Sequence, residues 1–174
     1  MALGLDYGRF DWLDRGTGST AELYRSRLEL VERADQAGFY GYHLAEHHAT
    51  PLGMAPSPSV FFAVLAERTS QIRFSPMAFL LPLYHPLRLV EEVCMLDHLS
   101  GGRVEVGVSR GVSPYEINSY DVDPETTREI FEETLEIYRT AMCKPVLDHA
   151  GKHYQFRDVP MEIEPLQRPY PPLW

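Results

Sequence analysis

The chain has 174 residues, of which 44% are hydrophobic and 24% are charged, a composition typical of a globular protein with material for one core. Its net charge of -9, without any Lys or Arg cluster, argues against a nucleic-acid surface. No segment approaches the roughly 20 apolar residues that span a bilayer, and no secretory signal is visible, so we expect a cytoplasmic location. Cys94 and Cys143 each lie within a helical pattern, and we expect two buried, reduced thiols.

The first part of the chain predicts a strand followed by a helix. The apolar run "LGLDYG" at residues 3–8 predicts the first strand. A helix is expected to begin at Ser19 or Thr20 as N-cap, with Glu22 close behind, and to end just before Gly38.

Two further strand and helix units follow. "YGYHLAE" at 40–46 predicts a second strand, and Ser57 or Ser59 is expected to start a second helix. "IRFSPMAFLL" at 72–81 is almost continuously apolar and predicts a third strand that is buried on both faces. A third helix is expected from about Pro86.

The last third of the chain adds a fourth unit and a strand pair. "RVEVGVS" at 103–109 predicts a fourth strand, and a fourth helix is expected to open near Asp123 or Pro124. "GKHYQFRDVPMEI" at 151–163 is interpreted as an inserted β-hairpin with its turn near Asp158 or Pro160.

Regular alternation of strand and helix predicts parallel strands joined by right-handed crossovers, either in an open doubly wound sheet or in a barrel. The glycine signatures of open-sheet nucleotide sites, G-x-G-x-x-G and G-x-x-x-x-G-K-[ST], are missing. Barrel sites lie at the carboxyl ends of strands, and polar side chains are expected there at Asp6, Glu46, His47, His48 and Arg110. We therefore predict an α/β fold, a (β/α)8 TIM barrel, of which residues 1–174 supply about the first four βα units plus the small inserted hairpin.

A metallohydrolase barrel is one alternative. Such barrels place two His at alternate positions of the first strand, whereas "LGLDYG" contains none. His43, His47 and His85 remain available as ligands, but nothing in their spacing requires a metal, and adjacent His47 and His48 are expected to point in different directions.

Several motifs together carry a family resemblance. "EHH" after the second strand, "GMAPSPSVFFAVLAERTSQIRFSP" and "LLPLYHPLRLVEEVCMLDHLSGGRVEVGVSRG" resemble the N-terminal half of the bacterial luciferase-like flavin-dependent monooxygenases, in particular the alkanal monooxygenase α subunit. The resemblance implies a barrel that takes reduced FMN from a separate NAD(P)H flavin reductase and forms a C4a-hydroperoxyflavin with O2. That species would oxygenate a small organic substrate such as an aldehyde or a ketone. A homodimer or heterodimer is also implied.

The same resemblance assigns roles to individual residues. It implies that His47 is catalytic, that Glu46 contacts the flavin environment, and that Arg110, in "SRG", binds the phosphate. Met77 and Ala78 correspond to a strained bulge, sometimes with a non-proline cis peptide, under the flavin ring. Ser109 and Val112 complete the expected cofactor-binding set; Ser109 stands where the α subunit has a reactive cysteine, which excludes thiol chemistry there.

Two other interpretations stay open: a deazaflavin-dependent oxidoreductase, and a non-enzymatic flavin-binding homologue. A complete barrel of this class needs roughly 250 residues. We therefore expect residues 1–174 to be the N-terminal portion of a single domain, with Trp174 leading into a fifth strand and a further segment completing the barrel.

Overall fold

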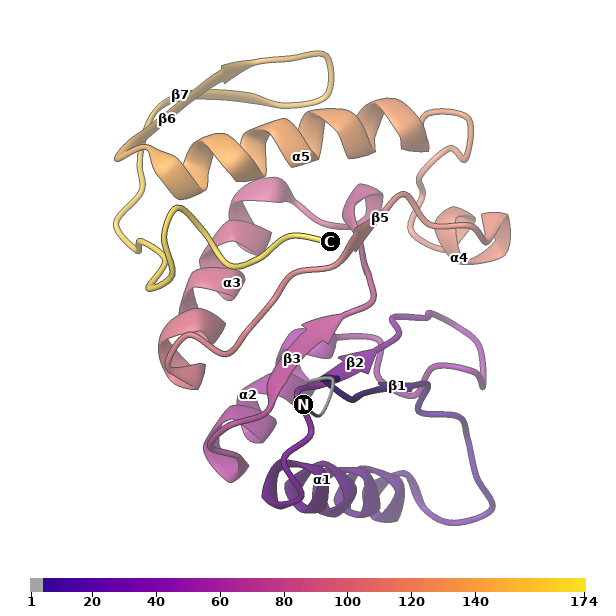
Figure 1. Ribbon diagram of the computed structural model, residues 1–174. Helices are drawn as coiled ribbons and strands as arrows, with labels where there is room; N and C mark the ends of the chain where they lie inside the picture. The colour runs from indigo at the N-terminus through magenta and orange to yellow at the C-terminus, as the bar shows by residue number, and fades with distance from the viewer. Residues whose placement is uncertain (1–4) are drawn as a thin grey trace.

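Parallel strands form the centre of the molecule in the computed structural model, which describes residues 5–174 (Figure 1). Strands β1 (Gly8–Asp11), β2 (Gly41–Leu44) and β3 (Arg73–Pro76) form one parallel sheet in that order. β4 (Phe79–Leu80) pairs in parallel with β5 (Val108–Ser109). The mixed α/β fold with parallel neighbours in chain order agrees with the predicted architecture.

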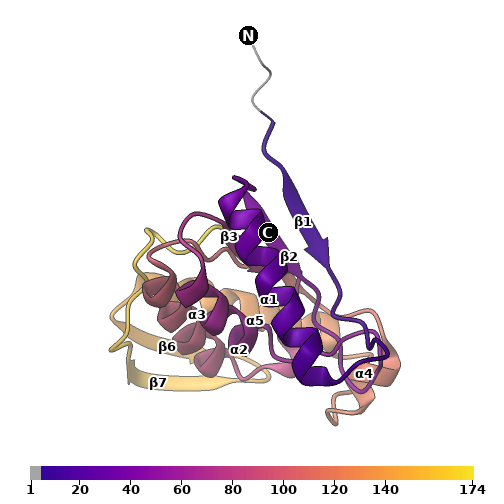
Figure 2. The same ribbon diagram turned by 90° about the horizontal axis from the view of Figure 1, so that it is seen from below.

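The first three long helices lie on one side of these strands. The long ones are α1 (Thr20–Gln36), α2 (Pro58–Arg68), α3 (Pro86–Ser100) and α5 (Thr127–Cys143). Two short ones are the 3-10 turn η1 (Leu81–Leu83) and α4 (Pro114–Asn118). Figure 2 shows β1 at the outer edge of the sheet, with α1, α2 and α3 together on the same side of the strands. None of the helices in residues 5–174 is both long and apolar enough to cross a membrane.

Three predicted helix starts are confirmed, because their signals are local. Ser19 caps α1 by accepting a hydrogen bond from the Glu22 amide, while the Glu22 carboxylate accepts from the Ser19 amide at 2.8 Å. Ser57 is the N-cap of α2, and Pro86 is the first residue of α3. α3 ends at Gly101, whose φ of 62° lies in the left-handed region that glycine adopts at low cost.

The predicted position of the first strand is wrong. β1 begins at Gly8 rather than ending there, and its register pairs Gly8 with Gly41 and Asp11 with Leu44. Residues 1–4 lie outside the described part of the chain. Asp6 therefore precedes β1, and buried Asp11 occupies the carboxyl end, where it accepts a hydrogen bond from the Tyr42 hydroxyl at 2.9 Å.

The third and fourth strands are less regular than predicted. The run at 72–81 is interrupted between β3 and β4 at Met77 and Ala78, whose peptide bond is cis. In the segment at 103–109, only Val108 and Ser109 form a regular strand, while Val104 makes an isolated parallel bridge to Phe74. Leu173 makes a parallel bridge to Val106, at the next strand position expected in a barrel.

Two boundaries in the last third of the chain also differ from the prediction. The fourth long helix, α5, begins at Thr127, because Asp123 instead forms a turn that accepts the Glu125 amide. The hairpin exists as β6 (Val146–Ala150) and β7 (Gln155–Pro160), but its turn lies at residues 151–154. Asp158 sits within β7, and its amide hydrogen-bonds to the Asp148 carboxylate at 2.9 Å.

Two apolar clusters fill the space between helices and strands. One joins Tyr42, Phe62 and Phe74 with residues of α1 and α2; the other joins Phe79 and Tyr138 with residues of α3, α5 and the hairpin. Cys94 is buried in the second cluster, as expected. The expectation for Cys143 is wrong: it is the last residue of α5 and is exposed, because the helix ends there at the surface.

Asp35 fastens α1 to the start of β3. Its carboxylate accepts hydrogen bonds from the amides of Ser70, Gln71 and Ile72 at 3.0, 2.8 and 2.6 Å. Burial alone would raise the pKa of Asp35, but these hydrogen bonds outweigh it and lower the pKa below its ordinary value.

We expect Asp35→Asn to reduce the free energy of unfolding by about 1–2 kcal/mol at pH 7, because the new amide cannot accept from Ser70. Since the folded-state pKa is lowered, the stabilisation by the carboxylate is present above about pH 4 and is lost as the pH falls further. The difference between variant and wild type should therefore shrink in acid. Urea denaturation at pH 7 and pH 3 measures it, and an equal difference at both pH values would contradict this role for the charge.

Candidate functional site

The expected site residues gather where parallel strands end. Glu46 and His47 follow β2, Met77 and Ala78 follow β3, and Arg110 follows β5. Because β2 and β3 are parallel neighbours, and β5 runs parallel to β4, these carboxyl ends share one edge of the fold.

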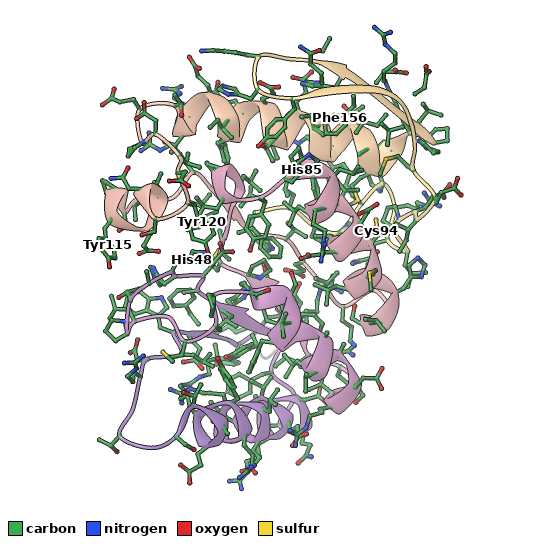
Figure 3. All side chains as sticks on the ribbon, turned by 180° about the vertical axis from the view of Figure 1, so that it is seen from behind. His48, His85, Cys94, Tyr115, Tyr120 and Phe156 are labelled. Carbon is green, nitrogen blue, oxygen red and sulfur yellow. The ribbon has the colours of Figure 1, made fainter. Side chains whose placement is uncertain are left out.

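Glu46 is the centre of a buried hydrogen-bond network. It is only 2% exposed; one carboxylate oxygen lies 2.8 Å from His48 Nε2 and the other accepts from the Tyr84 hydroxyl at 2.7 Å. His48 Nδ1 in turn lies 2.7 Å from the Tyr120 hydroxyl, and Figure 3 shows these two side chains together beside α4. Burial raises the pKa of Glu46, against the opposing effect of its hydrogen bonds.

The His47 ring is not part of this network and contacts a different carboxylate. Its Nδ1 lies 3.1 Å from Oε1 and 3.3 Å from Oε2 of Glu116. The edge of the ring meets Trp12 at a centroid separation of 5.9 Å, and the side chain is 24% exposed. The two adjacent histidines thus have separate partners, as expected from their neighbouring positions in an extended segment.

Glu116 reaches His47 because the segment after β5 folds back over the EHH residues. Gly111 turns the chain with φ 81°, and Ser113 caps α4 by accepting the Glu116 amide at 3.4 Å. Ile117 is buried and lies against Gly111. Glu116 is itself buried, so its carboxylate is held between the two segments.

Two glycines allow backbone segments of the site to approach closely. A Cβ at Gly53 would lie 2.3 Å from His47 Cβ, so only glycine leaves room for this histidine. A Cβ at Gly107 would lie 2.3 Å from the Pro76 carbonyl oxygen, next to the cis peptide of Met77 and Ala78. Both bulge residues are partly buried.

The remaining predicted residues lie around the end of β5. Ser109 is partly buried, and its hydroxyl accepts a hydrogen bond from the Gly111 amide at 3.1 Å. Arg110 is exposed, and no ion pair within residues 5–174 engages its guanidinium. Val112 is 86% exposed.

The sequence did not indicate Glu116, Tyr84 or Tyr120. Each contacts the EHH segment from a distance of 38 to 72 residues along the chain, and no local motif marks such pairs. Their place in the chain could have indicated Glu116 and Tyr120, because both follow the same strand end as Arg110. In the described part of the chain, no group of three or more His, Cys, Asp or Glu side chains is arranged to hold a metal ion.

Comparison with known proteins gives consistent matches. A family model described as luciferase-like monooxygenase matches residues 7–174. The chain is 46% identical to an uncharacterized protein, y4wF, of Sinorhizobium fredii over 98% of its own length and 50% of that protein. It is 30% identical to the oxygenase component of a flavin-dependent trigonelline monooxygenase from Acinetobacter baylyi, over 88% of this chain and 43% of the relative. The chain thus spans about half the length of these relatives.

Solved structures share the fold over a similar extent. The monooxygenase RslO1 of Streptomyces bottropensis superposes with a TM-score of 0.93 at 29% identity, covering 97% of this chain and 52% of RslO1. The oxygenating constituent of 3,6-diketocamphane monooxygenase from Pseudomonas putida, in complex with FMN, gives 0.83 at 23% identity, covering 95% and 48%. Structures of coenzyme F420-dependent enzymes share the fold at lower identity.

Proposed function

Because the chain belongs to the luciferase-like monooxygenase family, we propose that it is part of the oxygenase component of an FMN-dependent monooxygenase. The observation that carries the proposal is the meeting of three features at one edge of parallel strands. These are a half-buried histidine held by a carboxylate, the tightly packed bulge of Met77 and Ala78, and an arginine without an ion pair among the described residues.

Arg110 is the residue proposed to hold the FMN phosphate. A chain of net charge -9 needs a local cation to bind an anion, and a guanidinium can donate two parallel hydrogen bonds to phosphate oxygens. Arg110 is exposed at the carboxyl end of β5, the parallel neighbour of the strand that follows the bulge, and its guanidinium is in no ion pair of the described chain. The site residues therefore fit an anionic cofactor.

The bulge residues are proposed to support the flavin ring from below. Met77 and Ala78 present small or flexible apolar groups, and Phe79, the next residue in the chain, is fully buried. An apolar floor of this kind would exclude water from the reacting atoms.

His47 is proposed to move the proton that accompanies oxygen transfer, since an imidazole can accept and donate a proton and His47 follows β2, the parallel neighbour of the strand that leads to the bulge. Bound reduced FMN would supply the two electrons with which one oxygen atom of O2 goes to the substrate and the other leaves as water. Glu46, whose two carboxylate oxygens contact the side chains of His48 and Tyr84, is proposed to hold the EHH segment in place rather than to react.

The substrate is proposed to be a small organic compound such as an aldehyde or a ketone, and the electrons are proposed to come through a separate NAD(P)H flavin reductase in the cytoplasm. The name of the Acinetobacter relative, an oxygenase component, supports such a two-component arrangement. The FMN in the diketocamphane enzyme supports FMN as the flavin.

We also propose that residues 1–174 are the N-terminal portion of a barrel that a further segment completes. Phe10 and Trp12 on and beside the edge strand β1 are exposed, and edge strands of parallel sheets are normally covered. The chain also spans only about half of its relatives.

Anaerobic titration of the full-length protein with reduced FMN and with reduced deazaflavin tests the cofactor. We expect saturable binding of reduced FMN at a much lower concentration than reduced coenzyme F420. Preferential binding of the deazaflavin would favour the alternative oxidoreductase, and binding of neither would contradict the proposal.

A further inference from the structure

The contact between Glu116 and His47 determines which ring nitrogen of His47 carries the proton. Oε1 of Glu116 lies 3.1 Å from His47 Nδ1, and Oε2 lies 3.1 Å from the backbone nitrogen of His48. A carboxylate only accepts hydrogen bonds, and a neutral imidazole carries one N–H and one bare nitrogen. Nδ1 is therefore the donor, and Nε2 is left bare.

The Glu116 carboxylate contacts two consecutive residues, His47 and His48, at once. One carboxylate holds the backbone of His48 and the ring of His47, so it fixes both the position of the segment and the rotation of the ring. Glu116 is buried and comes from α4, 69 residues further along the chain, so this geometry is imposed from outside the EHH segment. No hydrogen bond within residues 5–174 engages Nε2.

We propose that Glu116 is a positioning residue that holds His47 in the Nδ1–H tautomer and thereby leaves Nε2 as the atom that accepts the proton during oxygen transfer. This inference rests on the proposed function for its consequence in turnover. The tautomer itself is a property of the protein without flavin or substrate. In hydrolases with a catalytic triad, a carboxylate orients a histidine base in the same way, and its removal lowers the turnover rate by several orders of magnitude.

Glu116→Gln is the sharpest test, because the new side chain has the same shape. Its amide oxygen can still accept the His48 N–H, but its NH2 group must then face His47 Nδ1 as a donor. The variant should therefore keep the fold while reversing the tautomer, which places the proton on Nε2. Glu132→Gln on the exposed surface of α5 is the matched control for the same chemical change.

Nitrogen NMR of the His47 ring in the full-length protein, at a pH where the ring is neutral, reads the tautomer directly. We expect a protonated Nδ1 in the wild type and in Glu132→Gln, and a protonated Nε2 in Glu116→Gln. Single-turnover oxygenation should fall by roughly 10²-fold in Glu116→Gln, with binding of reduced FMN and melting temperature near wild type.

The same loss must be absent when His47 is already gone. In the His47→Ala background, Glu116→Gln should have little further effect on turnover, since it acts through the ring. The proposal is overturned if wild type and Glu116→Gln have the same tautomer, or if the two substitutions lower turnover independently. If Glu116→Gln does not fold, the wild-type spectrum is sufficient: a protonated Nε2 in the wild type overturns the proposal. If the wild type oxygenates no substrate, the proposed function is contradicted. The tautomer measured by NMR does not depend on activity and still tests the role of Glu116.

Discussion

His47→Ala is expected to lower single-turnover oxygenation by about 10²–10⁴-fold while leaving the affinity for reduced FMN nearly unchanged. The reason is that the proposed role of the imidazole is proton transfer, whereas the proposed phosphate contact lies on Arg110 at a different strand end. Rapid mixing of the reduced FMN complex with O2 and substrate, followed by product analysis, measures the turnover. Anaerobic titration measures the affinity.

His98→Ala is the matched control for this experiment. His98 lies in the last turn of α3 and bonds the Glu164 carbonyl at 2.9 Å on the exposed surface. It should leave turnover at the wild-type level. Unchanged turnover in His47→Ala would assign His47 a structural role, and the proton transfer would have to belong to another group.

Arg110→Ala is expected to weaken FMN by roughly 10- to 150-fold, equivalent to about 1.5–3 kcal/mol, and to leave riboflavin binding little changed. FMN and riboflavin differ only in the phosphate, so the ratio of their affinities isolates the contact that Arg110 is proposed to make. Arginine is exposed here and is not needed by any ion pair of the described chain, so its removal should cost little stability.

Fluorescence titration of both flavins against wild type, Arg110→Ala and Arg157→Ala gives this ratio. Arg157 is an exposed arginine on β7 and controls for the loss of one positive charge. Equal losses for FMN and riboflavin in Arg110→Ala would place the phosphate elsewhere.

Local signals made the starts of α1, α2 and α3 predictable from sequence. The capping box of Ser19 and Glu22 and the glycine at 101 act within one turn of the helix ends, so the residues that decide the boundary are adjacent in sequence. β1 was misplaced because its limits depend on pairing with β2, and a short apolar run does not specify that register.

The site was only partly predictable for the same reason. Histidines and an arginine after strand ends indicated where chemistry lies, since the ends of parallel strands meet at one edge. The partners of the histidines depend on how the segment at 110–120 folds back. Glu116 approaches His47 from the short helix α4, and its contacts with His47 and His48 join residues far apart in the chain, which no local sequence pattern marks.

Oxygen-isotope labelling shows whether the protein transfers an oxygen atom of O2 to a substrate. The full-length protein, loaded with reduced FMN or with reduced deazaflavin, is mixed with ¹⁸O2 and a panel of aldehydes and ketones, and the product masses are measured. We predict, with FMN only, a product that has gained one labelled oxygen atom, the second labelled atom appearing in water. A product that has gained two hydrogens and no label, formed with the deazaflavin, would contradict it.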